Sequence, residues 1–243
     1  SEFLPDRLFE NNQASVQGPA LKDWTLEPIL PALADKVERY LKKESKTPEP
    51  FLLYMPLTSP HTPLSVNKEW LGKSGLGLYA DFVMETDDGF GQILEALDRN
   101  GFADNTLVIF TSDNGPTYDN GYKDGTTVVG TEAEIDRGHD ASGKWHGGKN
   151  TIYEGGTRVP MIVRWPGKVA AGETNTTAWY FADVLPTLAD LAGANAPSDV
   201  DGVSVLPTIL GKDQDLSDRT LYWEFFESGF QQAVRQGDWK AIR

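Results

Sequence analysis

A short apolar run that stops abruptly at a carboxylate and an amide is the feature that most limits how this chain can fold. Residues Leu107–Phe110 are all apolar, with β-branched and aromatic side chains among them, and Thr111-Ser112-Asp113-Asn114-Gly115 follows. Such a run predicts a strand buried on both faces of a sheet, as in α/β proteins. Asp and Asn disfavour strands and favour turns, so the chain should leave the sheet at Asp113.

Asp113 and Asn114 therefore stand where α/β proteins bind ligands, outside the carboxyl end of a strand. A carboxylate oxygen and a carboxamide oxygen are the hard ligands that Ca²⁺ or Mg²⁺ prefers. A simple strand-to-loop turn could have the same sequence. The metal interpretation therefore needs support from other segments.

Periodicity and composition predict further elements of the same kind. They are a helix from about Pro31 to the Lys- and Glu-rich stretch before Pro48, a strand over Phe51–Met55, an amphipathic helix from Tyr79 to Leu97 closed by Asn100-Gly101, a strand over Met161–Trp165, and a short helix over Ala182–Leu191. The strand–helix–strand order that ends at Phe110 predicts a parallel strand pair with a right-handed crossover. Residues 1–24 lack periodicity and are expected to be irregular.

The C-terminal residues change in style from about Leu221 onward and predict short antiparallel strands. Phe230–Arg235 and Trp239–Arg243 are expected to form a hairpin around Gln236-Gly237-Asp238. We therefore expect two domains, an α/β domain over residues 1–215 and a small antiparallel subdomain beginning at residues 216–243. Because the chain starts at Ser1 and stops on a hairpin strand, we also expect it to be a fragment.

Charge and composition exclude several classes of function. The formal net charge is −14, so nucleic acid is not an expected partner. The chain contains no cysteine, which excludes disulfides and thiolate chemistry within it. No apolar run approaches the length of a membrane span, so no membrane partner is expected.

Three histidines occur, His61, His139 and His146, all in polar, Gly- or Pro-rich loops. A single loop histidine is most often a surface residue. However, His61 follows a predicted strand, as Asp113 does. Enzymes of the α/β class assemble their sites from groups delivered at strand ends, so His61 is a candidate site residue.

A second dense region is the segment from Gly147 to Pro160, in which two glycine pairs allow close backbone approach. Lys149 between these pairs is suited to an oxyanion such as sulfate or phosphate, although a solvated lysine remains an alternative. Glu154 could be a base or a turn-stabilising acceptor, and Arg158 is equally ambiguous. Asp87-Asp88 falls mid-helix, where we expect a solvated face rather than a metal site.

Taken together, these segments resemble the sulfatase family of the alkaline phosphatase superfamily. The matching segments are PFLLYMPLTSPHTPL, YADFVMETDDGFGQILEALDRNG, NTLVIFTSDNGP, GGKNTIYEGGTRVPMIVRWPG, FADVLPTLADLAG, DGVSVLPTILG and LYWEFFESGFQQAVRQGDWKAIR. They span nearly the whole chain from about residue 31, in the family's order. The resemblance implies an alkaline-phosphatase-like mixed sheet flanked by helices, followed by the start of a small antiparallel α+β subdomain.

The resemblance also implies a chemistry and a set of site residues. Sulfatases hydrolyse sulfate esters with a formylglycine, made from the Cys or Ser of a Cys/Ser-x-Pro-x-Arg motif, and with a divalent cation, usually Ca²⁺ (Mg²⁺ is possible). Asp113 and Asn114 match metal ligands, and Lys149 matches the lysine that contacts the sulfate. His61 matches a histidine that protonates the leaving group or binds the sulfate. His146 and His139 are expected to line the substrate pocket.

The chain departs from the family pattern in respects that bear on activity, since the strand ending in paired aspartates that completes the family's metal shell, and the Lys and His that follow its nucleophile, are not found in it. It has no cysteine and no Ser-x-Pro-x-Arg, so the formylglycine position is missing. We expect a fragment that carries part of the metal and sulfate site but is inactive alone. The alternatives are a phosphonate or phosphodiester hydrolase of the same superfamily and a non-catalytic binding module.

Partners and location follow from the same resemblance. The expected partner is a sulfated small molecule or carbohydrate, and the full-length protein is expected in the periplasm or outside the cell. A sheet that lacks neighbouring strands exposes unpaired edges, so self-association is a further expectation.

Overall fold

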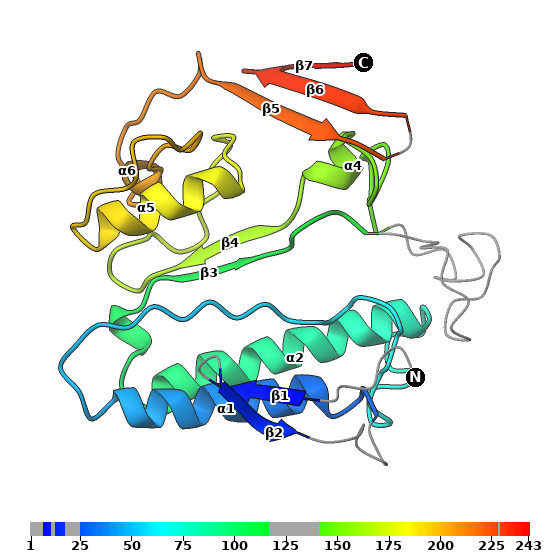
Figure 1. Cartoon of the computed structure of the whole chain (residues 1–243), viewed down its shortest axis with the longest axis vertical. Helices are drawn as coiled ribbons and strands as arrows, with labels where there is room; N and C mark the ends of the chain where they lie inside the picture. The colour runs from blue at the N-terminus through cyan, green and yellow to red at the C-terminus, as the bar shows by residue number, and fades with distance from the viewer. Residues whose placement is uncertain (1–6, 11–12, 18–24, 117–140, 228) are drawn as a thin grey trace. The chain divides into compact units, whose positions relative to one another are not determined.

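The computed structural model describes residues 7–10, 13–17, 25–116, 141–227 and 229–243 (Figure 1). The chain divides into two compact units. The first contains the described residues up to Ala96, and the second contains those from Leu97 onward.

Two long helices dominate the first unit, α1 (Ile29–Glu44) and α2 (Leu78–Arg99). The buried face of α1 recurs at helical spacing and consists of Leu30, Ala34, Val37 and Leu41. The helices meet where Leu30 covers Gly89: a Cβ atom at Gly89 would lie 3.2 Å from the Leu30 side chain. Both predicted helices are therefore confirmed, and the absence of a side chain at Gly89 lets them approach closely.

The buried face of α2 contains two carboxylates that periodicity did not single out, Asp81 and Glu85. Asp81 accepts backbone N–H groups from Gly72 at 2.7 Å and Ser74 at 2.8 Å. Glu85 accepts the backbone N–H of Asn67 at 2.9 Å. These bonds satisfy buried acids and fix the loop before α2, so the two residues are structural.

The acidic pair on the same helix lies on its opposite side. Asp87 and Asp88 are both exposed, and Asp88 Oδ2 accepts a hydrogen bond from Gln92 Nε2 at 2.8 Å. The prediction of a solvated helix face at this pair is confirmed.

The predicted strand at Phe51–Met55 is wrong. These residues belong to no strand and, among the described residues, hydrogen-bond to no strand. Leu52 is 71% exposed and Tyr54 is 84% exposed. An apolar run becomes a strand only when a neighbouring strand pairs with it, and within the described ranges no strand is paired with these residues. The predicted parallel pair is therefore not formed, and self-association through such exposed segments stays a prediction.

The N-terminal residues also differ from the prediction of irregular structure. Strands β1 (Arg7–Glu10) and β2 (Gln13–Gln17) pair antiparallel, with a register shift between Leu8 and Phe9. These strands are short and polar-rich, so they carry too little periodicity to be recognised in the sequence.

In the second unit, β3 (Val108–Thr111) pairs antiparallel with β4 (Met161–Arg164), and the short helix η1 (Ala103–Asn105) precedes β3 (Figure 1). Both strands occur where they were predicted. All four residues of β3 are half-buried rather than fully buried. Among the described residues β3 has one paired neighbour, so full burial on both faces is not reached.

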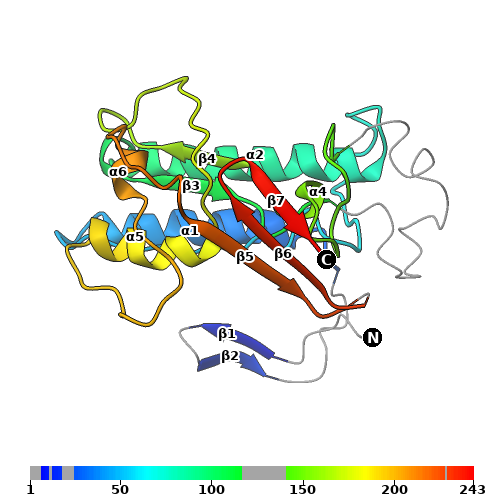
Figure 2. The ribbon, with the colours of Figure 1, turned by 90° about the horizontal axis from the view of Figure 1, so that it is seen from above.

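The rest of the second unit consists of short helices and a three-stranded antiparallel sheet. These elements are α4 (Glu154–Thr157), η2 (Phe181–Asp183), α5 (Val184–Leu191), α6 (Leu206–Ile209), β5 (Thr220–Phe225), β6 (Gln231–Gln236) and β7 (Trp239–Ile242). Figure 2 shows β5, β6 and β7 side by side, as the hydrogen-bonded pairs require. The predicted C-terminal hairpin is confirmed.

The fold is therefore α/β with a small antiparallel sheet near its C-terminal end. The division into domains at residue 215 stays a prediction. Within the described ranges, no helix combines the length and the apolar character needed to cross a membrane.

Candidate active site

Asp113 and Asn114 lie in the turn that follows β3. The Asn114 N–H donates to Asp113 Oδ1 at 2.9 Å, and Asn114 Nδ2 donates to the Gly115 carbonyl at 2.9 Å. This arrangement leaves Asn114 Oδ1 as the acceptor atom of that amide. Asp113 is exposed and Asn114 is half-buried. Two adjacent side chains thus present oxygen atoms at the end of the strand.

The segment that carries Lys149 packs against this turn through backbone hydrogen bonds. The Lys149 N–H donates to the Pro116 carbonyl at 2.8 Å, and the Gly115 N–H donates to the Gly156 carbonyl at 2.9 Å. The structure therefore brings two separate candidate segments, around Asp113 and around Lys149, into direct contact within one unit.

The glycine pairs make this contact possible because carbonyl oxygens occupy the space that side chains would need. A Cβ atom at Gly115 would lie 1.7 Å from the Gly155 oxygen, and one at Gly155 would lie 1.9 Å from the Gly147 oxygen. Asn150 has a φ of 68°, a left-handed conformation that Asn tolerates better than most residues. The backbone is thus folded tightly on both sides of Lys149.

The histidines are placed differently from one another. His146 precedes the first glycine pair, is exposed, and stacks edge-on against Tyr153 with ring centroids 4.5 Å apart. His61 lies in the first unit, is exposed, and has its Nδ1 2.7 Å from the Thr62 carbonyl oxygen. The prediction for His139 falls outside the described residues. His146 therefore adjoins the Lys149 segment.

Glu154, the first residue of α4, is surrounded by cations. Its Oε1 accepts a hydrogen bond from Lys240 Nζ at 2.9 Å, and its Oε2 lies 3.6 Å from Arg235 and 3.7 Å from Arg158. Burial acts to raise the pKa of the Glu154 carboxyl, but the hydrogen bond and charge of Lys240, with the charges of Arg235 and Arg158, outweigh burial and lower it. Lys240 and Arg235 were missed in the sequence, because nothing in their local pattern indicates a partner some 80 residues away in the chain.

Asp113 and Asn114 fit part of the coordination shell of a metal ion. Their carboxylate and amide oxygens have the hard donor chemistry that Ca²⁺ takes, but Ca²⁺ requires about six to eight oxygen ligands. No group of three or more His, Cys, Asp or Glu side chains that could hold a metal occurs in the described ranges. The donor type therefore fits a divalent cation, and the two side chains would supply only part of the ligands that Ca²⁺ requires.

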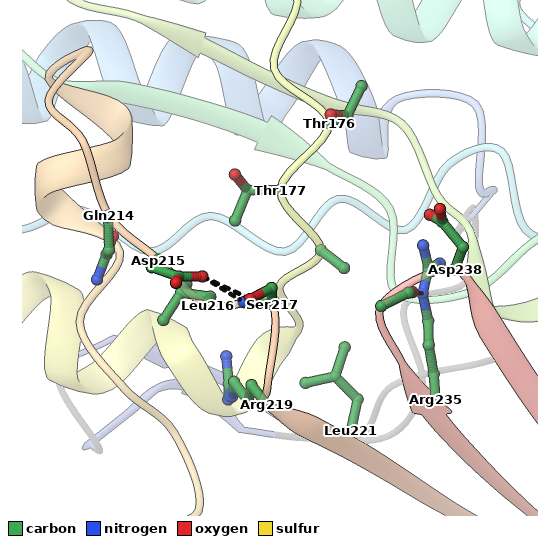
Figure 3. A pocket seen from close by; sticks show the side chains of 12 residues that line it. Thr176, Thr177, Gln214, Asp215, Leu216, Ser217, Arg219, Leu221, Arg235 and Asp238 are labelled. Atoms are coloured by element: carbon green, nitrogen blue, oxygen red, sulfur yellow. Dashed lines mark hydrogen bonds between the residues drawn. The ribbon is translucent and has the colours of Figure 1, made fainter.

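A cavity of about 270 Å³ lies elsewhere in the second unit (Figure 3). Arg219 in its wall is held by two hydrogen bonds to Asp183, and Arg235 donates to the Gly237 carbonyl. None of the predicted site residues lines it. Both guanidinium groups in the cavity wall have partners within the chain, which disfavours this cavity as an anion-binding site.

Comparison with known proteins decides the family. The model of the family described as "Sulfatase" matches residues 6–194. The chain belongs to the sulfatase family. The match covers β3, the Asp113 turn, the Lys149 segment and α5, which are among the segments on which the resemblance rested. The last two of those segments, residues 201–211 and 221–243, lie beyond the matched range.

Named relatives and a solved structure agree with this assignment. An N-acetylgalactosamine-6-O-sulfatase of Bacteroides thetaiotaomicron is 35% identical over 221 residues, which are 90% of this chain and 41% of that protein. A steryl-sulfatase of Rattus norvegicus is 38% identical over 192 residues, 78% of this chain and 31% of the relative. A solved B. thetaiotaomicron protein from a locus for glycosaminoglycan metabolism superposes with a TM-score of 0.78 at 35% identity.

The superposition covers 90% of this chain and 44% of the solved one. This sulfatase chain thus spans less than half the length of these relatives. Its fold is that of its alkaline-phosphatase-like sulfatase neighbours, as the resemblance implied.

Proposed function

We propose that this chain carries the metal and sulfate edge of the active site of a sulfatase that acts on sulfated carbohydrates. The observation that supports this most is the backbone contact between Lys149 and Pro116, which places the lysine segment against the Asp113 turn. The B. thetaiotaomicron relative is named as a sulfatase of a 6-O-sulfated amino sugar, which favours a carbohydrate substrate.

The proposed roles follow from the chemistry of each side chain. Asp113 and Asn114 would ligate a divalent cation, Ca²⁺ by resemblance, which supplies positive charge to the sulfate oxygens. Lys149 would hold a sulfate oxygen as a point charge, and His61 would act as an acid toward the leaving oxygen. The 243 residues contain no cysteine and no Ser-x-Pro-x-Arg, so the formylglycine nucleophile has no source within them.

The proposal predicts binding without turnover. N-acetylgalactosamine 6-sulfate, titrated into the chain in the presence of Ca²⁺, should bind, and Lys149→Met should weaken binding by about tenfold or more because a hydrogen bond to a charged group is lost. Calorimetry measures both affinities. An aryl sulfate incubated with the same protein should show no calcium-dependent hydrolysis.

Lys168→Met is the matched control, since Lys168 is an exposed lysine in the turn after β4. Binding that is equal for the sulfated and unsulfated sugars, or unchanged in Lys149→Met, would contradict the sulfate role. Tighter binding of a steryl sulfate than of the sugar would overturn the carbohydrate assignment in favour of the class named for the rat relative. Hydrolysis by the pure chain would refute its proposed inactivity.

Calcium should bind weakly. Two side-chain ligands are far fewer than Ca²⁺ requires, so the dissociation constant should be about 10⁻⁴ M or higher, and Asp113→Ala should abolish the binding. Calorimetric titration with CaCl₂ measures this, with Asp87→Ala on the solvated face of α2 as the control. If the unmodified chain binds Ca²⁺ with submicromolar affinity and Asp113→Ala loses it, the site has more ligands than these two. If Asp113→Ala binds Ca²⁺ as tightly as the unmodified chain, Asp113 is not a ligand.

The alternatives are less well supported. The family model and both named relatives are sulfatases, which disfavours a phosphonate or phosphodiester hydrolase. A non-catalytic module would bind without the dependence on Asp113 described above. A periplasmic or extracellular location rests on the family resemblance alone.

A further inference from the structure

Glu154 joins the C-terminal sheet to the segment that carries Lys149. Its partners Arg235 and Lys240 belong to β6 and β7, whereas Glu154 opens α4, five residues after Lys149. The closest contact, Lys240 Nζ to Glu154 Oε1, is 2.9 Å. One carboxylate thus links elements that lie more than 80 residues apart in the chain.

Lys240 is held in a specific position rather than lying loosely on the surface. Its side chain is only 12% exposed. Its Nζ also donates to Thr157 Oγ1 at 3.0 Å and lies 4.8 Å from the centre of the Trp223 ring. Ion pairs between exposed residues contribute little, but a sheltered ammonium with three fixed contacts is strongly oriented.

The backbone next to Glu154 is bonded to the candidate site. The Gly155 N–H donates to the His146 carbonyl at 2.8 Å, and the Gly156 carbonyl accepts the N–H of Gly115 at 2.9 Å. Residues 154–156 therefore contact the C-terminal sheet through the side chain of Glu154. Through their backbone they contact the Asp113 turn and the Lys149 segment. A displacement of Glu154 would be passed directly to Gly115 and His146.

We propose that Glu154 is a positioning residue, which through Lys240 holds the Lys149 segment in place against the turn that follows β3. A role as a general base is disfavoured, because cations hold the pKa of the Glu154 carboxyl below its ordinary value and its oxygens are occupied by them. Any effect of this positioning on sulfate binding rests on the proposed function, whereas the positioning itself does not.

Amide hydrogen exchange, measured on the whole 243-residue chain without sulfate, tests the positioning. Glu154→Gln and Lys240→Met should each speed exchange at the amides of Lys149, Gly155 and Gly115 by about tenfold, which corresponds to the loss of one charge-assisted bond. Because both substitutions remove the bond between Glu154 and Lys240, the double variant should exchange more slowly than the product of the two single accelerations predicts. Lys240→Arg, which keeps the charge, should retain most of the protection.

Glu224→Gln is the matched control, because Glu224 is an exposed glutamate of β5 in the same sheet. It should leave the three amides unchanged. Arg235→Gln removes a longer ion pair, 3.6 Å from Glu154, so it should accelerate amide exchange less than Lys240→Met does. It replaces Lys240→Met as the test if that variant fails to fold. Unchanged protection in Glu154→Gln, or an equal acceleration throughout β5 and β6, would overturn the proposal.

Protonation of the Glu154 carboxylate at low pH should destabilise the fold in the same way as Glu154→Gln does. A carboxyl whose folded pKa lies below its ordinary value near 4.5 stabilises the fold above that value, and the stabilisation is lost as the pH falls through the lowered pKa. The difference in unfolding free energy between the unmodified chain and Glu154→Gln should thus be full at pH 7 and shrink below pH 4.5. A difference independent of pH would contradict the ionic pairing with Lys240, Arg235 and Arg158.

These measurements separate two kinds of failure. If the exchange result holds but the sugar titration with Lys149→Met shows no effect, Glu154 positions the segment and the sulfate role is wrong. If the sugar titration succeeds but exchange does not change in Glu154→Gln, the sulfate role stands and the positioning role is refuted.

Discussion

Replacing Asp183 by alanine should lower the unfolding free energy of the second unit by about 3–5 kcal/mol, because it leaves a sheltered guanidinium without its partner. The Asp183 side chain is fully buried and that of Arg219 is 13% exposed. Arg219 donates to both carboxylate oxygens, at 2.8 and 2.5 Å. The backbone N–H groups of Tyr180 and Val203 donate to the same carboxylate at 3.0 and 2.9 Å.

The four hydrogen bonds of Asp183 join the start of α5, the loop before α6 and the residue that precedes β5. The hydrogen bonds that Arg219 donates to Asp183 are the main reason that the pKa of Arg219 is raised. A guanidinium stays protonated even without such a partner, so Asp183→Ala leaves an unpaired charge at Arg219. Urea unfolding followed by tryptophan fluorescence measures the loss. We expect the short helices to unfold first, since their connections depend on this carboxylate.

Asp35→Ala is the control for Asp183→Ala. Asp35 pairs with Arg39 at 2.8 Å, but the two side chains are 64% and 66% exposed, so its removal should cost less than about 1 kcal/mol. A loss in Asp183→Ala as small as that in Asp35→Ala would show that the buried pair contributes no more than a surface pair.

Gly155→Ala should be nearly as damaging, at about 3 kcal/mol or more, and should also abolish the sulfate binding that we propose for the Lys149 segment. The added Cβ would lie 1.9 Å from the Gly147 oxygen and 2.8 Å from the His146 oxygen. Both obstacles are backbone carbonyls, which cannot move aside as a flexible side chain can. The segment must open, with loss of the hydrogen bond from the Gly155 N–H to the His146 carbonyl.

Gly91→Ala provides the comparison for Gly155→Ala. Gly91 lies within α2, and a Cβ there would have no neighbour within 4 Å. Alanine should therefore stabilise the helix by about 0.5–1 kcal/mol. Thermal unfolding measures both variants. A Gly155→Ala protein as stable as the unmodified chain would show that the glycine segment is looser than its backbone contacts indicate.

Local pattern was enough to predict the elements whose periodicity is strong. The α1 and α2 helices follow from apolar residues at helical spacing, and the C-terminal hairpin follows from two alternating runs around Gly237. Phe51–Met55 has an equally apolar sequence yet remains outside any strand, because a strand depends on a partner that a local window does not contain.

The residues of the candidate site were likewise predictable only where the signal is local in the sequence. Asp113 and Lys149 could be found from the sequence because strand ends and glycine-rich loops are local features, and the resemblance joined them. Lys240 could not be found, because its importance arises from a contact with Glu154 across the fold. Asp81 was also missed: its carboxylate is buried because it accepts N–H groups of a neighbouring loop, which no hydropathy pattern records.

The backbone-to-backbone contact at Gly115, Gly147 and Gly155 has a consequence for protein engineering. Because carbonyl oxygens fill the contact, its specificity cannot be varied by exchanging side chains within it. A lysine loop transplanted alone onto another scaffold would lose the complementary turn that gives it shape. Residues 113–116 and 142–157 would have to be moved together as one cassette, with diversity introduced at its exposed rim, for example at His146 and Tyr153.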